Sequence, residues 1–582
     1  MNELLNIKSL TTSFKNEERD FIAVNDISIS LNKGETLAIV GESGSGKSVT
    51  SLSILRLLNE KSSSIQGEIL FQKNGSSTDL LKLSEKEMRK FRGKEISMIF
   101  QEPMTSLNPV IKCGEQVAEM LRLHLGMSRS EAKQKTIALF EKVKLPRAEH
   151  LYHSYPHQLS GGQKQRIMIA MAISCNPRLL IADEPTTALD VTVQKSILEL
   201  LKELQQEFNM SMIFITHDLG IVSELAHSVA IMYKGKIVET GKADDILNHP
   251  QHPYTMGLLA CKPNLKVRWK LLPTIGDFMK ENEDGSFSST VFSASIEDKN
   301  LVENIDERKE RLNILYKKEP VLTLKNIGKA FSIKRPGLGF GRDHVQAVDN
   351  VSFSVYPGET LGLVGESGCG KSTLGKIILR LLEPTSGEIT YEGKNIRTIS
   401  AKEMRLLRKK VQVIFQDPYS SLNPIMRIGE AIAEPMMVHG IYTSKKDCKN
   451  AALELLEKVG LRPEHYNRYP HEFSGGQRQR IVIARALSVQ PEFIICDECV
   501  SALDVSVQAQ IINLLQQLKR ERGFSYIFIS HDLGVVKYFS DRIAVMNDGK
   551  IEEIGDADQI YHSPSSEYTR RLIDAIPKVA YI

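Results

Sequence analysis

The pattern of hydrophobic and polar positions near the start of the chain predicts a strand, a loop and a helix in succession. The apolar run at 37–40 has the length of a buried strand and ends at the glycine-rich segment 41–48. Leu52, Leu55 and Leu58 then recur at helical spacing, which predicts a helix with one apolar face. A strand that turns through several glycines into a helix is the context of a phosphate-binding loop.

The same succession returns in the second half of the chain, so the sequence is one unit written twice. Marker residues recur at nearly constant offsets: Lys47 and Lys371 are 324 positions apart, whereas Gln101 and Gln416, Ser160 and Ser474, Asp183 and Asp497, and His217 and His531 are 315, 314, 314 and 314 apart. About nine extra residues therefore lie between Lys47 and Gln101 in the first copy. We expect them in a lengthened surface loop at 62–77, which is rich in Ser and Gly.

The repeat sets the expected domain organisation. We place the first unit at 1–262 and the second at 320–582. Between them, 263–319 mixes Gly, Ser and charge with little sustained periodicity, which predicts a solvated linker, although 296–318 could form a charged helix. Trp269, the only tryptophan, lies in this linker and is expected to pack on a domain surface.

Composition fits a soluble, two-domain protein. The 582 residues are 41% hydrophobic and 25% charged, and the formal net charge of +4 gives no whole-chain basic field, so no nucleic-acid partner is predicted. The seven cysteines are scattered, which argues against a disulfide framework. The chain starts without the apolar run of a signal peptide, and its longest apolar run, 167–173, is too short to span a membrane. Work at a membrane would therefore require partners.

Two phosphate-binding loops are predicted, one in each copy. Their glycines let backbone N–H groups surround phosphates, and the N-terminus of the following helix adds a favourable field. Lys47 and Lys371 should reach the β- and γ-phosphates, and the hydroxyls of Ser48 and Ser372 should bind magnesium. The candidate nucleotide-binding residues are Gly41, Glu42, Ser43, Gly44, Ser45, Gly46, Lys47, Ser48 and Val49, and in the second copy Gly365, Glu366, Ser367, Gly368, Cys369, Gly370, Lys371, Ser372 and Thr373.

Paired carboxylates end a second apolar strand in each copy. Asp183 and Asp497 are expected to hold magnesium, directly or through water, and Glu184 and Glu498 to polarise the attacking water. Cys496 and Cys499 flank the second pair at a metal-like spacing. Because no second such pair completes a zinc site, we expect these cysteines simply to pack.

Histidines and glutamines follow two further apolar strands. His217 and His531 occur at the same offset as the carboxylates, so we interpret them as γ-phosphate contacts rather than core histidines. Gln101 and Gln416 each open a proline-bearing loop. Their amides could touch magnesium or the attacking water, and the loops could swing with the state of the nucleotide.

The segment LSGGQKQR at 159–166 and its copy FSGGQRQR at 473–480 complete an ordered motif set. With these segments, both halves of the chain resemble the nucleotide-binding domain of ATP-binding cassette (ABC) transporters, and the resemblance covers nearly all the chain outside the linker. It implies an α/β fold with two tandem P-loop NTPase domains. Each would have a RecA-like core, an antiparallel β subdomain and an α-helical signature subdomain.

In that family the domains pair head to tail, which implies two composite ATP sites in this chain. Ser160, Gly161 and Gly162 would complete the site built on Lys371, whereas Ser474, Gly475 and Gly476 would complete the site built on Lys47. The resemblance also assigns Asp190 and Asp504 to the inter-domain D-loop and Phe14 and Phe331 to stacking on adenine.

Further motifs resemble the dipeptide, oligopeptide and nickel importers, and in particular their fused ATPases of the glutathione or microcin C type. These motifs are Ser-Leu-Asn-Pro after both glutamines, Tyr-Pro-His before both signature segments, and His-Pro-Tyr-Thr at 252–255. The resemblance implies ATP and Mg²⁺ as ligands, two membrane-spanning permease subunits and an extracytoplasmic solute-binding protein as partners, and a peripheral location on the cytoplasmic face of the inner membrane. It leaves the solute open.

Two departures from the subfamily pattern affect these expectations. Only Cys261 lies near the position of the iron–sulfur cysteines of some relatives, so no such cluster is expected. Cys499 stands where the first copy has Pro185, and Glu567-Tyr-Thr replaces His-Pro-Tyr-Thr, but neither change removes a catalytic group.

Two alternative functions use similar cassettes. Ribosome-associated translation factors also fuse two of them, but their long charged helical linker suits RNA better than the proline-, glycine- and acid-containing segment at 273–285. DNA-repair cassette ATPases would show zinc cysteines or coiled-coil insertions, which this sequence lacks.

Overall fold

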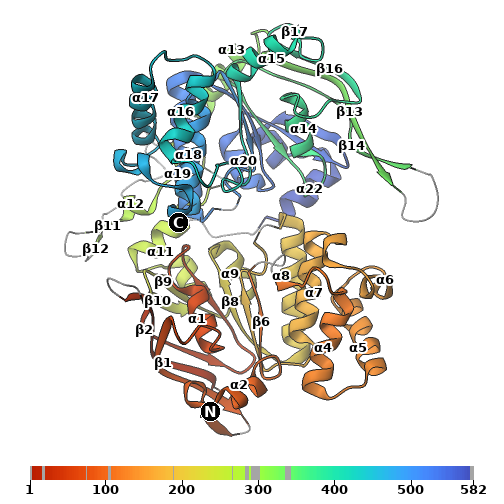
Figure 1. The fold of residues 1–582 in the computed structure, drawn as a ribbon, viewed down its shortest axis with the longest axis vertical. Helices are drawn as coiled ribbons and strands as arrows, with labels where there is room; N and C mark the ends of the chain where they lie inside the picture. The colour runs from red at the N-terminus through yellow and green to blue at the C-terminus, as the bar shows by residue number, and fades with distance from the viewer. Residues whose placement is uncertain are drawn as a thin grey trace.

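The computed structural model describes residues 3–15, 20–73, 75–101, 106–187, 189–264, 267–281, 287–289, 302–334, 342–501 and 503–576. Two units of similar architecture lie one above the other, the first below and the second above in Figure 1. Each unit contains a six-stranded sheet and a separate four-stranded antiparallel sheet. The expectation of two tandem α/β units is confirmed.

The six-stranded sheet of the first unit has the order β10-β9-β3-β8-β7-β6, with β10 antiparallel to the rest. Its strands are β3 (Thr36–Val40), β6 (Ile96–Ile99), β7 (Leu179–Asp183), β8 (Ser211–Thr216), β9 (Ser228–Tyr233) and β10 (Lys236–Lys242). The antiparallel sheet, in the order β2-β1-β4-β5, consists of β1 (Glu3–Phe14), β2 (Phe21–Asn32), β4 (Ser63–Lys73) and β5 (Ser76–Asp79). The helices are α1 (Lys47–Ile54), α2 (Glu85–Phe91), α4 (Cys113–Leu125), α5 (Arg129–Lys142), α6 (Ala148–Tyr152), α7 (Gly161–Ile173), α8 (Val191–Phe208), α9 (Leu219–Leu225), α10 (Ala243–Asn248) and α11 (Pro253–Ala260).

The second unit repeats this topology, with the sheets β18-β19-β20-β15-β21-β22 and β14-β13-β16-β17. The strands are β13 (Leu322–Lys334), β14 (Arg342–Val355), β15 (Thr360–Val364), β16 (Ser386–Tyr391), β17 (Lys394–Asn395), β18 (Val411–Ile414), β19 (Phe493–Asp497), β20 (Ser525–Ile529), β21 (Arg542–Asn547) and β22 (Lys550–Asp556). The helices are α14 (Lys371–Ile378), α15 (Ala401–Lys410), α16 (Ile428–Val438), α17 (Lys445–Lys458), α18 (Gly475–Leu487), α19 (Val505–Arg522), α20 (Leu533–Phe539), α21 (Ala557–His562) and α22 (Glu567–Asp574).

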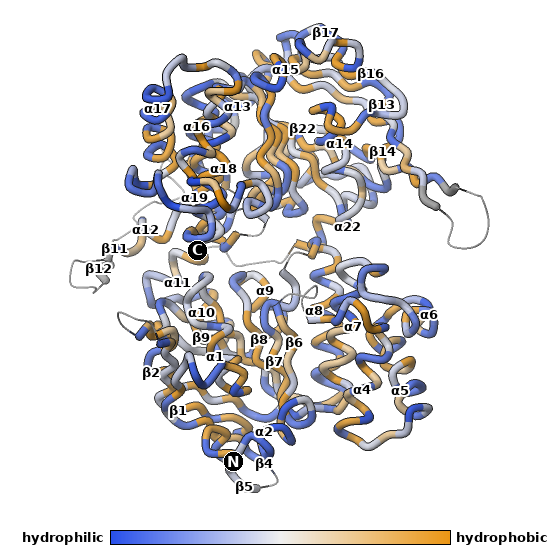
Figure 2. The backbone as a smooth tube through the Cα atoms, viewed as in Figure 1, coloured by the Kyte–Doolittle hydropathy of each residue, from blue (hydrophilic) through white to orange (hydrophobic). Residues whose placement is uncertain are grey.

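Alternate residues of each central strand serve two cores. In β7, Leu179 and Ile181 pack with α1 and the antiparallel sheet, whereas Leu180 and Ala182 pack with the helical layer that includes α7 and α8. Both faces of the strand are covered, which explains why the sequence reads as an unbroken apolar run. Figure 2 shows the same hydrophobic character along the central strands of both units.

Two predicted details near the first phosphate loop are wrong. The helix after the loop ends at Ile54 instead of continuing to Leu58, because Arg56 takes a left-handed conformation with φ of 50°. The described part of the stretch 62–77 lies mostly in strands and not in a surface loop. β4 (Ser63–Lys73) is longer than its counterpart β16 (Ser386–Tyr391) and pairs with β5.

The linker between the units contains α12 (Ile275–Phe278), β11 (Met279–Glu281), β12 (Phe287–Ser289) and α13 (Ile305–Leu315). The prediction of a solvated linker is wrong for its described part. Leu272 is buried in the core of the second unit and exchanges two 2.8 Å hydrogen bonds with the side chain of Asn513 on α19. Leu312 and Leu315 of α13 are also buried, and Trp269 packs against the second unit as expected.

No helix in the described ranges combines the length and the apolar character needed to cross a bilayer.

Candidate functional site

The first phosphate loop lies between β3 and α1, and its glycines are required by its shape. A Cβ at Gly41 would lie 2.2 Å from the carbonyl oxygen of Met232, and one at Gly46, where φ is 102°, would lie 2.6 Å from the carbonyl oxygen of Ala23. The corresponding Gly365 and Gly370 of the second loop are equally enclosed. The sequence therefore folds each loop as a tight turn that ends at a helix N-terminus.

A buried lysine holds each loop from inside. The ammonium group of Lys47 donates to the carbonyl oxygens of Gly41 and Glu42 at 2.8 and 2.9 Å, and Lys371 does the same in its own loop at 2.7 and 2.8 Å. The hydroxyl of Ser45 is buried, and it has no hydrogen-bond partner among the residues that the structure describes. The cation, the free hydroxyl and the helix N-terminus together suit a phosphate group.

A serine and a carboxylate meet beside each loop. Ser48 donates to Asp183 at 3.1 Å, and Ser372 donates to Asp497 at 2.8 Å. Burial raises the pKa of Asp183 to about 6, against the hydrogen bond from Ser48, and the adjacent carboxylate of Glu184 also raises it. In the described ranges no three His, Cys, Asp or Glu side chains gather as a metal site. A hydroxyl and one carboxylate nevertheless fit Mg²⁺, which is commonly held by few protein oxygens together with substrate phosphates.

The carboxylate of Glu184 lies close to several of the other polar side chains predicted for the first site. It follows β7 with a left-handed φ of 46°, and its carboxylate accepts from Gln101 at 3.1 Å and lies 3.4 Å from Nδ1 of His217. Burial alone would raise the pKa of Glu184, but the hydrogen bond and charge of His217, together with the ammonium of Lys47 at 3.9 Å, lower it to about 2. The same contact raises the pKa of His217, against the effect of its burial.

The second site has a similar arrangement, and the hydroxyl contacts of the two sites differ. Gln416 donates to Glu498 at 2.8 Å and His531 lies 3.7 Å from it. In the first site the hydroxyl of Thr187 also donates to the carboxylate of Glu184, at 2.9 Å, whereas Ser501 donates to the backbone carbonyl of Glu498 instead. The sequence did not single out Thr187 and Ser501, although both follow their glutamate by three residues.

The two units meet at their phosphate loops. Ser43 donates to Asp504 of the opposite unit at 3.1 Å, and the hydroxyl of Ser506 contacts the carboxylate of Glu42. In the mirrored contact, the backbone N–H of Ser367 donates to Asp190 at 3.4 Å. Each phosphate loop is thus contacted by the other unit, at Asp504 or Asp190, while the head-to-tail pairing of each signature segment with the opposite ATP site stays a prediction.

The signature segments begin the helices α7 and α18. Ser160 and Ser474 cap α7 and α18, and their hydrogen bonds among the described residues are those of their own capping boxes. Gly162 packs so closely on Val193 that a Cβ there would lie 2.9 Å from it, whereas a Cβ at Gly475 would meet no atom within 4 Å. The helix starts are therefore open on one side, while the role of these residues toward ATP stays a prediction.

The candidate adenine-stacking aromatics lie on strands of the antiparallel sheets. Phe14 is half-buried at the end of β1, and Phe331 on β13 is 37% exposed with the ammonium of Lys329 over its ring. Their stacking role stays a prediction. Residues 102–105, which belong to the expected swinging loop after Gln101, lie outside the described residues.

A tyrosine that the sequence marked only as a subfamily feature contacts each phosphate loop. The hydroxyl of Tyr254, on α11, accepts a 3.2 Å hydrogen bond from the backbone N–H of Glu42, and Tyr568, on α22, accepts one of 3.1 Å from Glu366. The departure at 567–569 therefore keeps the contacting group. Cys496 and Cys499 are both buried, which confirms that they pack.

The chain is similar to known proteins over nearly all its length. A family model described as ABC transporter matches residues 24–187 and 348–501, and one described as oligopeptide/dipeptide transporter, C-terminal region, matches 238–286 and 553–581. The glutathione import ATP-binding protein GsiA of Salmonella typhimurium is 49% identical over 580 residues, which is 99% of this chain and 90% of that protein. GsiA of Escherichia coli K12 is also 49% identical, over 579 residues.

Solved structures of ATP-binding cassettes are also similar to part of this chain. The dimeric post-hydrolysis state of the ATP-binding cassette MJ0796 bound to ADP and Pi is 31% identical and covers 40% of this chain and 98% of its own, with a TM-score of 0.37.

Proposed function

This chain belongs to the ABC transporter family, and we propose that it is the ATP-hydrolysing subunit that energises import of peptides or related small solutes through a membrane transporter. The main support for the proposal is the pair of phosphate loops. Asp504 contacts the first loop and Asp190 the second, each from the opposite unit. Two such loops facing each other can bind two ATP molecules between the halves, so that closure and reopening follow binding and hydrolysis.

The residues of each site support separate roles in phosphate binding, water polarisation and Mg²⁺ binding. Lys47 and the N-terminus of α1 would hold the phosphates, and Glu184, kept ionised by His217, would orient and polarise the attacking water. Ser48 and Asp183 would hold Mg²⁺, which neutralises charge on the phosphates when it is bound. Catalysis would then come chiefly from positioning and charge stabilisation.

The solute is proposed from the relatives. Proteins named glutathione import ATP-binding protein share 49% identity with this chain over 99% of its length, which supports glutathione or a similar small peptide. The oligopeptide-transporter region matches at the end of both halves, which favours transport over the ribosomal alternative.

Exposed apolar side chains support docking to two permease subunits. Val110 and Ile425 occupy equivalent positions of the two copies and are 79% and 83% exposed, and the equivalent Leu123 and Val438 are 73% and 53% exposed. Large apolar residues exposed in matching places are typical of interaction sites. They would seat this subunit on the cytoplasmic face of the inner membrane, with an extracytoplasmic binding protein delivering solute to the permease.

Transport in a reconstituted system tests the proposal. The chain would be purified with a candidate permease pair and placed in proteoliposomes with a candidate binding protein. We expect ATP-dependent uptake of labelled glutathione or a small peptide, and none with Glu184→Gln combined with Glu498→Gln. ATP hydrolysis that no permease stimulates, together with co-sedimentation with ribosomes, would favour the translation-factor alternative.

A further inference from the structure

A cavity of about 500 Å³ lies between the linker and the second unit, away from the phosphate loops. On one side it is lined by Arg268, Trp269 and Lys270 of the linker and by α13, and on the other by α19 and the ends of α20 and β21. Its lining is strongly cationic: the basic residues are Arg268, Lys270, Arg308, Arg311, Lys519 and Arg520, and the acidic residues are Glu303, Glu307 and Asp541.

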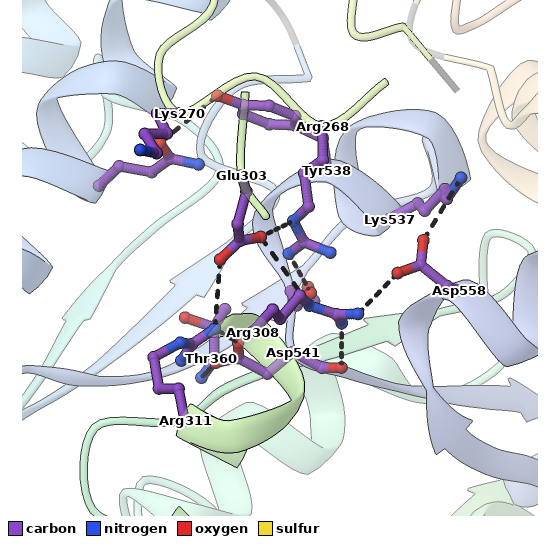
Figure 3. Close-up of polar contacts among 12 residues, drawn as sticks. Arg268, Lys270, Glu303, Arg308, Arg311, Thr360, Lys537, Tyr538, Asp541 and Asp558 are labelled. Atoms are coloured by element: carbon purple, nitrogen blue, oxygen red, sulfur yellow. Dashed lines mark hydrogen bonds and ion pairs between the residues drawn. The ribbon is translucent and has the colours of Figure 1, made fainter. Parts of the chain in front are cut away.

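The acids of the cavity are shared among several cations. Glu303 lies 3.0 Å from Arg268, 3.9 Å from Arg308 and 3.7 Å from Arg311 (Figure 3). Asp541 in turn pairs with both Arg311, at 2.6 Å, and Lys519, at 2.8 Å. The lining itself holds six basic and three acidic residues, and of the basic ones Arg308 also pairs with Asp556 at 3.2 Å and Asp558 at 2.6 Å, outside the lining.

Two buried guanidinium donors point to a missing acceptor. Among the described residues, neither Nη1 of Arg268 nor Nε of Arg308 has a hydrogen-bond partner, although Nε of Arg308 lies 3.9 Å from the carboxylate of Glu303, and the side chain of Arg308 is only 7% exposed. A buried charged donor without an acceptor is costly, so it favours whatever anion can reach it. The cations also repel one another. Burial lowers the pKa of Lys519, the carboxylate of Asp541 raises it, and the charges of Arg311 and Arg268 lower it further.

We infer that this cavity is a binding site for a small organic anion that carries at least two carboxylate or phosphate groups. Its volume is in the range of small-molecule pockets. Arginine forks bind both carboxylate and phosphate oxygens through paired hydrogen bonds. The rings of Trp269 and Phe539 line the same space and would cover the carbon skeleton of the ligand.

Such a ligand would contact both the linker and the helices α19 and α20 of the second unit. These helices follow two candidate ATP-site residues in the sequence, Asp504 and His531. α19 begins directly after Asp504, and α20 follows His531 by one residue. The site is separate from the ATP sites, so its test does not depend on the proposed transport function.

Trp269 provides a direct measurement, because it is the only tryptophan in the chain and it lines the cavity. The full-length protein, with ADP saturating both phosphate loops, would be titrated at constant ionic strength with citrate in one arm and pyrophosphate in the other. We expect a saturable change in tryptophan emission and a higher melting temperature with at least one probe. A response to citrate alone identifies a carboxylate ligand, and a response to pyrophosphate alone a phosphate ligand.

Two exposed arginines on α19 form a matched pair of variants. Arg520 lines the cavity and Arg522 does not. Arg520→Gln should raise the Kd of the responding probe about tenfold, and Arg311→Gln should do the same, while Arg522→Gln should leave it unchanged. Absence of a saturable response to both probes, or equal weakening by Arg520→Gln and Arg522→Gln, would overturn the proposal.

Discussion

Single residues make the two candidate catalytic glutamates, Glu184 and Glu498, unequal. Both take the same left-handed backbone conformation, with φ of 46° at Glu184 and 49° at Glu498, in which a non-glycine residue is strained. Only Glu184 receives a hydroxyl hydrogen bond, from Thr187, and only Glu184 lies within 4 Å of its lysine among the ion pairs of the described residues. The first site therefore holds its carboxylate more firmly than the second.

We predict that Thr187→Val lowers kcat for ATP by up to tenfold without raising KM, because one hydrogen bond to a charged group orients the carboxylate but does not hold the nucleotide. The measurement is steady-state ATPase activity. Ser501→Ala is the matched control and should have little effect, because Ser501 contacts the backbone of Glu498. A rise in KM with constant kcat would show that Thr187 does not act through Glu184.

We also predict that Glu184→Gln combined with Glu498→Gln leaves ATP binding intact and nearly abolishes turnover. The amide preserves the size and most contacts of the side chain but cannot polarise water as the carboxylate does. Nucleotide binding and steady-state hydrolysis would be measured on the same preparation. Unchanged hydrolysis would contradict the assignment of both glutamates.

The sequence predicted the functional side chains that belong to a recognisable motif within one short segment. The parallel strands β3, β7 and β8 end at the same edge of the sheet. Asp183 ends β7, and the other predicted side chains, Lys47, Glu184 and His217, come after β3, β7 and β8 in turn. The sequence did not predict Thr187, because its contact depends on how the left-handed turn at Glu184 aims two side chains.

Among the elements, α11 and α22 connect the end of each unit to its phosphate loop. Tyr254 is completely buried, and its hydroxyl is the acceptor for the backbone N–H of Glu42. Motif reading could identify this tyrosine but not its partner, which is 212 residues away.

Removing that hydroxyl should loosen the phosphate loop. We predict that Tyr254→Phe weakens ATP binding at the first site about fivefold, the value of one neutral hydrogen bond. Binding would be measured with Lys371→Ala present, so that only the first loop binds tightly. Tyr568→Phe in the same background is the control and should leave this affinity unchanged, and equal effects of the two variants would argue against a local contact.

The linker shows why composition alone predicted the wrong degree of burial for this segment. Its polar sequence predicts solvation, but Leu272 is buried by groups of the second unit that lie far along the chain, and Leu312 and Leu315 of α13 are buried too. Arg308 pairs with Asp558, 250 residues away, and Arg311 pairs with Asp541, 230 residues away. Partners at such distances leave no pattern in the linker itself.

Asp541 anchors this element and predicts an acid-dependent stability. Burial alone would raise the pKa of Asp541, but Lys519 and Arg311 lower it far below its ordinary value. Because the folded pKa is the lower one, the stabilisation is complete above the unfolded pKa of about 4 and is lost as pH falls below it.

We therefore expect Asp541→Asn to destabilise the protein at pH 7 by about 3 kcal/mol, since it removes the buried carboxylate that pairs with Lys519 and Arg311. The melting temperature of the variant should depend less on pH between about 5 and 3 than that of the unchanged protein. Thermal unfolding across this range is the measurement, with Glu310→Gln, on an exposed position of α13, as the control. A variant with an unchanged pH slope would refute the anchoring role.

For the whole molecule, the matched exposed apolar residues predict where partners dock. We expect Val110→Asp combined with Ile425→Asp to leave the ATPase activity of the isolated subunit unchanged and to abolish co-purification with the permease, because a charge would have to be buried in each contact. Leu271→Asp, which adds a charge at a 49% exposed linker position, is the control and should still co-purify. Retained co-purification of the double variant would place the permease elsewhere.

The crossing of the two units makes each ATP site dependent on both halves. Asp504 already contacts the loop of Lys47, and Asp190 that of Lys371, so the signature that begins at Ser160 should serve the Lys371 site. We predict that Ser160→Ala reduces trapping of nucleotide at the Lys371 site and spares the Lys47 site, because the lost hydroxyl and weakened cap lie on the opposite unit from the affected loop.

The readout is vanadate trapping of 8-azido-ATP, assigned to each half after cleavage within the linker. Ser474→Ala is the matched variant and should show the reverse, a loss at Lys47 with Lys371 spared. A loss in the same half as each substitution would mean that the signature acts within its own unit. In that case the contacts of Asp190 and Asp504 would hold the halves together without forming composite sites.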